Sequence, residues 1–313
     1  RGECPRWRAF LGDVTGGDAD LQAYLQRMAG YCLTGSTDAH ALFFLYGTGA
    51  NGKSVFVNVL STMLGDYAAN APMDTFMEAR GDRHPTDLAG LRGARFVASI
   101  ETEQGRRWNE SKVKAITGGD KVSARFMRQD FFEYTPQFKL VIAGNHKPAI
   151  RNVDEAMKRR LHLIPFTVTI PPERRDGKLT EKLLAERDGV LAWALAGCLQ
   201  WQRTGLQPPA SVVSATEEYF EAEDAQGQWI AERTEPSPHA FALTRELYLD
   251  WKDWADLNGE FVGSIKRFSA DLSARGYLQK RNGTGQRGFV GLRVLPRPNA
   301  YAQAIAGLDT LSR

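Results

Sequence analysis

The stretch from residue 47 to residue 54 constrains the fold of this chain more than any other part of the sequence. It fits the phosphate-binding pattern G-x-x-x-x-G-K-[ST] at every fixed position. An apolar run at residues 41–46 predicts a buried strand before it, and apolar residues at helical spacing predict a helix after it that ends at Gly65. The eight residues are Gly47, Thr48, Gly49, Ala50, Asn51, Gly52, Lys53 and Ser54.

A strand, a glycine loop and a helix in this order direct backbone amides and a helix N-terminus at one point, which suits a polyphosphate. The alternative, a glycine-rich turn with a surface lysine, leaves the flanking strand and helix unexplained. We therefore expect the loop to bind ATP, with Lys53 at the β- and γ-phosphates and the Ser54 hydroxyl as a ligand of Mg²⁺. The predicted fold class is α/β with a parallel sheet.

Polar residues follow two further predicted strands, at 94–100 and 138–144. Glu101 and Glu103 come directly after the first, and Asn145 comes after the second. Beside a phosphate-binding loop, one such carboxylate holds Mg²⁺ and the other acts as the base; Glu101 is the metal candidate, but the sequence leaves the two roles open. We expect Asn145 to contact the γ-phosphate or orient the attacking water. The alternatives are surface glutamates and an asparagine that only ends a strand.

Arg159 and Arg160 form a basic pair after the last of these strands. Because they lie C-terminal to every predicted phosphate-binding element, one of them is a candidate arginine finger, which stabilises charge on the γ-phosphate of a neighbouring subunit. The sequence does not decide between the two, and surface charge is the alternative.

Basic and aromatic residues alternate along a predicted β-hairpin at residues 121–135. Lys121 and Arg125 lie on its first strand, and Met127 and Arg128 lie in its turn. This pattern predicts contact with single-stranded DNA, whereas the alternative is an ordinary edge hairpin.

Charge is unevenly distributed, although the net charge is only +3. Residues 101–160 carry a net +5, residues 211–260 carry −9 and residues 261–300 carry +7. Two basic regions around an acidic one are consistent with contact to nucleic acid at two places. Solvated surface charge explains the acidic block equally well.

The remaining composition argues against several other classes of protein. Cys4, Cys32 and Cys198 are far apart, and the five histidines lack zinc-ligand spacing, so we expect neither a disulfide framework nor a structural metal. A reducing cytoplasm fits this composition. No apolar run reaches membrane-spanning length and no signal peptide is visible, so no membrane association is expected. The chain begins at Arg1, as a piece of a longer protein would.

The C-terminal part is predicted to be a second domain. Long helices are expected at 179–200 and 211–232, and the proline-punctuated stretch 234–239 is the predicted boundary. Helices at 243–257 and 264–275 followed by a hairpin at 278–294 have the order of a winged helix. In the second helix Ile265 is expected to face the core. The residues expected to contact duplex DNA are Lys266, Arg267, Lys280, Arg281 and Arg287.

Five motifs in this order resemble the C-terminal helicase region of the phage and plasmid primase–helicase family, in superfamily 3 of the AAA+ class. They are the nucleotide loop, the acidic motif at 99–103, a hairpin motif at 114–126, a sensor strand at 138–148 and an arginine segment at 159–166. The resemblance implies a P-loop AAA+ ATPase core, a hexameric ring with ATP between subunits, and 3′-to-5′ unwinding at a replication origin. It also implies a primase region or partner elsewhere.

The expected organisation has five parts. An amphipathic helical stripe in residues 1–40 predicts an N-terminal collar. The parts that follow are the ATPase core at residues 41–170, a helical connector at 171–235, the winged helix at 236–300 and a tail at 301–313.

Two alternatives to a helicase remain open from the sequence. One is an ATP-dependent loader or remodeller that acts on protein partners, and the other is an origin-binding switch whose ATPase turns over slowly. DNA-stimulated hydrolysis together with strand displacement distinguishes a helicase from both. A small-molecule kinase would share the phosphate loop, but no acceptor pocket or lid is visible.

Overall fold

The structure is a computed structural model that describes residues 2–78, 86–100, 105–151 and 153–296. The chain divides into two compact units, Arg1–Glu223 and Asp224–Arg313. Within the described ranges, no helix combines the length and the apolar character that crossing a membrane requires.

The first unit contains a five-stranded sheet in the order β2-β3-β6-β1-β7, and all neighbouring strands are parallel. Strand β1 lies between β6 and β7, so Phe44 on β1 pairs with Ile142 of β6 and with Leu163 of β7. Because the strands are parallel, the loop after β1 and the residue after β6 lie at the same edge. The strands are β1 (Leu42–Tyr46), β2 (Ala68–Asn70), β3 (Phe96–Ile100), β6 (Lys139–Gly144) and β7 (Leu161–Pro165).

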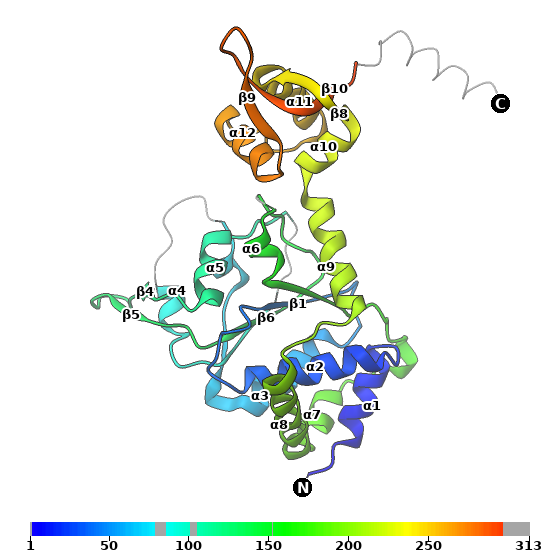
Figure 1. The fold of residues 1–313 in the computed structure, drawn as a ribbon. Helices are drawn as coiled ribbons and strands as arrows, with labels where there is room; N and C mark the ends of the chain where they lie inside the picture. The colour runs from blue at the N-terminus through cyan, green and yellow to red at the C-terminus, as the bar shows by residue number, and fades with distance from the viewer. Residues whose placement is uncertain (1, 79–85, 101–104, 152, 297–313) are drawn as a thin grey trace, which may run out of the picture. The chain divides into compact units, whose positions relative to one another are not determined.

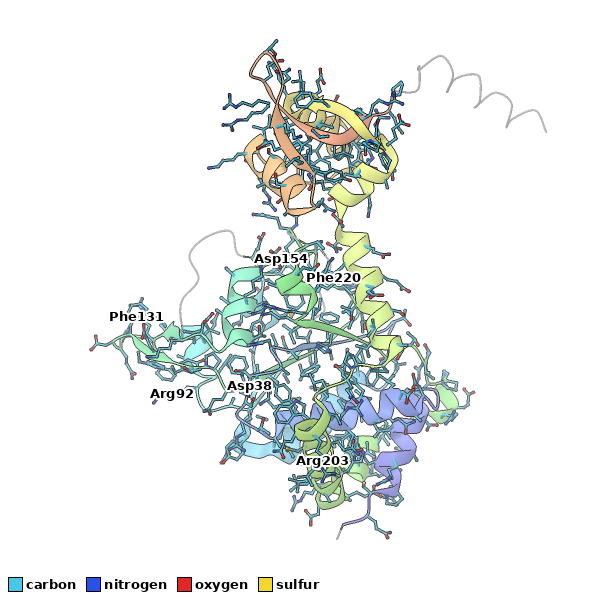
Figure 2. All side chains as sticks on the ribbon, viewed as in Figure 1. Asp38, Arg92, Phe131, Asp154, Arg203 and Phe220 are labelled. Atoms are coloured by element: carbon cyan, nitrogen blue, oxygen red, sulfur yellow. The ribbon has the colours of Figure 1, made fainter. Side chains whose placement is uncertain are left out.

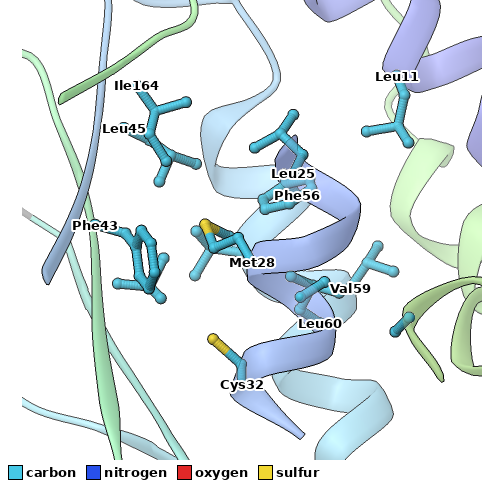
Figure 3. Packing of buried hydrophobic residues seen from close by; sticks show 14 of the residues in the cluster. Leu11, Leu25, Met28, Cys32, Phe43, Leu45, Phe56, Val59, Leu60 and Ile164 are labelled. Carbon is cyan, nitrogen blue, oxygen red and sulfur yellow. The ribbon is translucent and has the colours of Figure 1, made fainter. Parts of the chain in front are cut away.

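Helices cover both faces of this sheet, as Figure 1 shows. On one face Phe43, Leu45 and Ile164 pack against Met28 and Phe56 of the covering helices (Figure 3). Each such fully buried side chain contributes about 1.5–3 kcal/mol. The helices of this cluster are α1 (Pro5–Val14), α2 (Ala19–Cys32), α3 (Lys53–Leu64), α7 (Leu179–Leu184) and α8 (Arg187–Thr204).

On the other face Phe44, Ile142 and Leu163 pack with residues of a second set of helices. Strand residues thus alternate between the two clusters, so the first unit is a three-layer α/β structure, and the predicted α/β class with a parallel sheet is confirmed. The helices of this side are α4 (Thr86–Ala89), α5 (Glu110–Gly118), α6 (Glu155–Lys158) and α9 (Ala210–Glu223). Among the described residues, short 3₁₀ helices span Gly65–Tyr67, Met73–Phe76 and Pro172–Arg174.

The second unit packs three helices on an antiparallel sheet of order β8-β10-β9. Trp229, Leu247, Trp251 and Phe268 form its core, and the Trp229 indole donates to Asp250 at 2.9 Å. Its elements are α10 (Ala225–Arg233), β8 (Thr234–Leu243), α11 (Thr244–Asn258), α12 (Ile265–Ala274), β9 (Leu278–Arg281) and β10 (Arg287–Val294).

Several predicted elements differ in the structure. The proline-punctuated stretch is not a break, because it forms strand β8, and the predicted boundary at residue 236 lies inside the second unit. Pro236 and Pro238 are compatible with β8 because it is an edge strand, the position in a sheet where proline is tolerated. Ile265, predicted to face the core, is 41% exposed, because the first turn of α12 leaves it beside a surface groove.

The two long helices predicted at 179–200 and 211–232 are each divided into two. The first divides near Glu186, whose carboxylate accepts hydrogen bonds from the amides of Arg6 and Trp7 at 3.2 and 3.1 Å. The second divides at Asp224, whose carboxylate accepts from the amide of Gly227 at 3.0 Å and starts α10. In both cases an acidic side chain caps a helix N-terminus.

Candidate functional site

The loop between β1 and α3 requires glycine at two positions, Gly47 and Gly52. Gly52 has φ +81°, and a Cβ there would lie 2.5 Å from Val14 Cγ1. A Cβ on Gly47 would lie 2.1 Å from the carbonyl oxygen of Phe166, which follows β7. The loop therefore fits closely between helix α1 and the end of the neighbouring strand.

Lys53, the first residue of α3, is held by three oxygen atoms. Its ammonium donates to the Gly47 carbonyl at 2.8 Å, to Asn51 Oδ1 at 3.0 Å and to Asn145 Oδ1 at 3.1 Å. The lysine is 5% exposed, and burial lowers its pKa. These acceptors offset the cost of desolvating the charge and fix the ammonium at the mouth of the loop.

Asn51 and Asn145 thus converge on the same charge from different elements. Asn51 also donates to the Phe166 carbonyl at 2.7 Å, so it links the loop to the end of β7. Asn145 is exposed and follows β6, as the sequence indicated. Ser54 is exposed in the first turn of α3, where the backbone amides have no intrahelical acceptor. Thr48 and Ala50 are exposed beside them.

Glu101 and Glu103 lie outside the described residues. Strand β3, which ends just before them, pairs with β6 through Ile100 and Ala143. Among the described residues no group of three or more His, Cys, Asp or Glu side chains is arranged to hold a metal ion.

The structure separates the two arginines that the sequence could not distinguish. Arg160 is 8% exposed, donates from Nε to Thr117 Oγ1 at 3.1 Å and from a terminal nitrogen to the Ala156 carbonyl at 2.8 Å. Burial lowers its pKa, and the neighbouring charge of Arg159 adds to this. Arg159 is exposed, and its side chain makes no hydrogen bond or ion pair with another described residue, although its backbone amide donates to the Glu155 carbonyl at 3.2 Å. Only Arg159 is free to reach a ligand outside its own fold.

The predicted hairpin is present and projects from the first unit (Figure 1). Strands β4 (Val122–Ala124) and β5 (Phe132–Tyr134) pair antiparallel. Met127 is 74% exposed, and Arg128 has φ +61° in the turn. Lys121 is exposed at the base of the hairpin, on the side that leads in from α5.

Aromatic residues near the hairpin tip contact its basic side chains. Arg125 lies over the ring of Phe131, 4.7 Å from its centroid, and Phe131 is 59% exposed near the tip (Figure 2). Phe126 and Phe132 stack with their ring centroids 5.8 Å apart. The tip therefore offers cations and ring faces together, the two kinds of group that hold single-stranded nucleic acid.

In the second unit, α12, the start of α11 and the β9–β10 hairpin line a groove of about 630 Å³. Lys266 and Arg287 line it, together with Arg245, which the sequence analysis missed because it lies outside the basic block. The side chains of these three residues are exposed and have no ion pair or hydrogen bond to another described residue. Lys280 and Arg281 are exposed on β9.

Other arginines of this unit are paired with acids. Arg267, predicted to contact DNA, lies 3.8 Å from Asp271 and over the ring of Phe261, so it is partly engaged within the unit. The further pairs are Arg233 with Asp250, Arg275 with Asp224 and Arg293 with Glu235.

A family model described as a family of unknown function (DUF5906) matches residues 45–160, which include the nucleotide loop, the hairpin and both arginines. "Putative helicase 022R" of Frog virus 3 (isolate Goorha) is 27% identical over 289 residues, which are 85% of this chain and 29% of that protein. "Putative helicase L207/L206" of Acanthamoeba polyphaga mimivirus is 26% identical over 286 residues, with 84% and 29% covered. A "Putative primase" of African swine fever virus (strain Badajoz 1971 Vero-adapted) is 22% identical over 241 residues, with 70% and 25% covered.

The chain spans less than a third of the length of these relatives. Among solved structures, the apo NrS-1 C-terminal region superimposes with a TM-score of 0.56 and 13% identity, covering 94% of this chain and 77% of that one. At this identity the likeness concerns the fold. The predicted resemblance to helicases and primases is confirmed. These relatives belong to large DNA viruses, whereas the motifs had suggested phages and plasmids. The chain is a homologue of proteins named as helicases and primases of large DNA viruses.

Proposed function

We propose that this chain is the ATP-driven motor of a DNA helicase, with a P-loop AAA+ core of the superfamily 3 type. The observation that carries the proposal is the Lys53 ammonium, held by Gly47, Asn51 and Asn145 at the shared edge of β1 and β6. A γ-phosphate placed there meets a fixed cation, the N-terminus of α3 and a polar side chain of the neighbouring strand. The loop and Lys53 bind the polyphosphate, and Asn145 senses its terminal group.

The residues present fit a bound Mg²⁺. The Ser54 hydroxyl is exposed in the first turn of α3, next to the phosphate position, and is the proposed protein ligand together with Glu101. When bound, Mg²⁺ neutralises oxygens of the β- and γ-phosphates. Glu103 is then the candidate base that accepts a proton from the attacking water.

Arg159 is proposed to act in trans, on the nucleotide of the next subunit in a ring, which we expect to be hexameric. The exposure of the Arg159 side chain and its lack of a described side-chain partner support this role, and the burial of Arg160 supports a structural role for that arginine within its own subunit. An arginine that meets charge present mainly in the transition state raises turnover by ~10³–10⁵.

Single-stranded DNA is the proposed track. The hairpin tip, with Arg125, Met127, Arg128 and Phe131, is exposed and is the proposed element that grips the strand in the ring channel, with Lys121 at its base. Its arginines would contact phosphates, and its rings would stack on bases. The 3′-to-5′ direction follows from the family resemblance.

The second unit is proposed to be a winged helix that binds duplex DNA. Its unpaired cations support this, because Arg245, Lys266 and Arg287 gather on one groove while arginines elsewhere in the unit have acidic partners. Lys280 and Arg281 of β9 extend the basic surface. Arg267 is given a smaller role, since it is engaged by Asp271 and Phe261.

The remaining domain roles are proposals as well. Helices α1 and α2 correspond to the collar and residues 301–313 to a tail. The connector is shortened from the predicted 171–235 to residues 171–223, because residues 224–235 belong to the second unit. Since the matched relatives are much longer than this chain, a primase region or partner is proposed to act with it, in the cytoplasm of the infected or host cell.

Strand displacement tests the proposal against the two rivals. Wild type should release the shorter strand of a partial duplex with a 3′ single-stranded tail when ATP is supplied, and should release little with a non-hydrolysable analogue. Lys53→Ala should keep the fold and lose displacement. ATP hydrolysis without displacement on any tailed duplex would favour a loader or a switch.

A further inference from the structure

Helices α5 and α6 are joined at two separate points, and neither link belongs to the nucleotide site. Lys114 and Thr117, spaced i and i+3 on one face of α5, contact residues at the two ends of α6. Two links at different points fix the angle between the helices, whereas one link would leave a hinge. We call these helices with their two links the α5–α6 pair.

The first link is the ion pair between Lys114 Nζ and Asp154 Oδ2 at 2.5 Å. Asp154 also accepts from the Met157 amide through Oδ1 at 2.8 Å, so the same carboxylate starts α6 and holds α5 (Figure 2). Partial burial alone would raise the pKa of Asp154, but the hydrogen bonds from Lys114 and from backbone amides lower it. The carboxylate is therefore ionised and paired at neutral pH.

The second link is the buried hydrogen bond from Arg160 Nε to Thr117 Oγ1 at 3.1 Å. Arg160 also donates to the Ala156 carbonyl within α6, and Thr117 donates to the Val113 carbonyl within α5, so each partner is fixed to its own helix. The Thr117 carbonyl, at the end of α5, lies 2.9 Å from the Nδ1 atom of His40.

The two links stand between elements that the proposed function assigns to different tasks. Arg159, which follows α6 directly, is the candidate finger for the neighbouring nucleotide. Helix α5 ends at Gly118, and strand β4 of the DNA-gripping hairpin begins at Val122. The contacts near Arg159 therefore connect α6 to α5, and α5 leads within a few residues to the base of the hairpin.

We propose that the α5–α6 pair is the element that couples the nucleotide of the neighbouring subunit to the hairpin, with Thr117, Lys114 and Arg160 as its positioning residues. This inference rests on the proposed function. Because coupling is reciprocal, single-stranded DNA that moves the hairpin also positions Arg159 for hydrolysis. DNA-stimulated hydrolysis then depends on the two links, while hydrolysis without DNA depends on them little.

Thr117→Val and Lys114→Met each remove one link with a side chain of similar size. Thr216→Val is the matched control, because Thr216 is a threonine of α9 that likewise bonds within its helix at 2.7 Å and to a neighbouring element, the Leu163 amide, at 3.0 Å. The measurements are ATP hydrolysis with and without single-stranded DNA, affinity for that DNA and the melting temperature.

We expect the stimulation by DNA to fall about fivefold or more in Thr117→Val and in Lys114→Met, with near wild-type hydrolysis without DNA. Thr117→Ser, which keeps the acceptor, should restore it, and Thr216→Val should leave it unchanged. Wild-type stimulation in both link variants would overturn the coupling alone, as would an equal loss in Thr216→Val. A wild type with no DNA-stimulated hydrolysis would overturn the proposed function and the coupling with it.

Discussion

Gly47→Ala tests whether close packing around the loop, rather than its flexibility, creates the nucleotide site. The new Cβ would lie 2.1 Å from the Phe166 carbonyl oxygen and 2.2 Å from Asn51 Nδ2, whereas Cβ contacts below 3.0 Å essentially do not occur. Backbone or side chain must therefore move by roughly 1 Å, at a cost of about 1–3 kcal/mol. For a unit of this size, that lowers the melting temperature by about 2–12 °C.

The effect on ATP should exceed the effect on stability. Moving Asn51 breaks its bond to Phe166 and displaces the acceptor that holds Lys53, so the ammonium no longer lies at the γ-phosphate position. We expect ATP affinity to fall at least about tenfold, which corresponds to ~1.4 kcal/mol. Calorimetric titration of ATP and thermal melting of the same preparation measure both quantities.

Gly12→Ala is the matched control for this substitution. Gly12 lies in helix α1 with an ordinary helical backbone, and its added Cβ would meet no heavy atom within 4 Å. This variant should gain up to about 1 kcal/mol of stability and keep wild-type ATP affinity. Wild-type ATP affinity in Gly47→Ala, or the same behaviour in both variants, would show that close packing around Gly47 does not create the site.

Three further predictions concern other parts of the chain. Mixed rings of Lys53→Ala and Arg159→Ala subunits should hydrolyse ATP faster than either variant alone, because some sites regain a complete set of groups; no recovery despite proven co-assembly would place the finger within its own subunit. Burial lowers the pKa of Lys139 to about 8, below the value of 10.5 for the unfolded chain. Below pH 8 the buried ammonium is charged, and its desolvation opposes folding. As the pH rises from 8 to 10.5 the folded protein holds the neutral amine, so this desolvation cost disappears. The stability of wild type relative to Lys139→Met should thus rise by up to about 3 kcal/mol between pH 7 and 10.5 in denaturant melts, and a flat difference would contradict the burial argument. Lys266→Ala and Arg287→Ala should each make the negative slope of log duplex-DNA affinity against log salt shallower by about one. Arg293 is already paired with Glu235, so Arg293→Ala should leave this slope unchanged. Equal slopes in all three variants would show that the groove is not part of the DNA interface.

The nucleotide loop could be predicted from the sequence because its chemistry is local. The motif fixes the positions of its glycines, lysine and serine relative to the strand before the loop and the helix after it. The loop pattern and the patterns of the flanking strand and helix therefore indicate the same phosphate-binding structure. Asn145 was predictable for the same reason, as a polar residue at the end of a parallel strand.

The difference between Arg159 and Arg160 could not be predicted, because it depends on a contact with Thr117 that is distant in the sequence. The same holds for Glu186, which lies where the long helical pattern divides and accepts hydrogen bonds from the first turn of α1, far away in the sequence. Strand β8 was missed because its prolines indicate a loop, and only the sheet order shows that they occupy an edge. Arg245 joins the groove only after α11 and α12 pack together.

The central claim is that this chain converts ATP hydrolysis into work on single-stranded DNA, and steady-state hydrolysis measured across a titration of single-stranded DNA tests it most directly. Wild type should turn over ATP at a rate that rises with DNA and saturates, and Lys53→Ala should be inactive at every DNA concentration while melting as a folded protein. Turnover that is insensitive to DNA, or that survives in Lys53→Ala, would contradict the account.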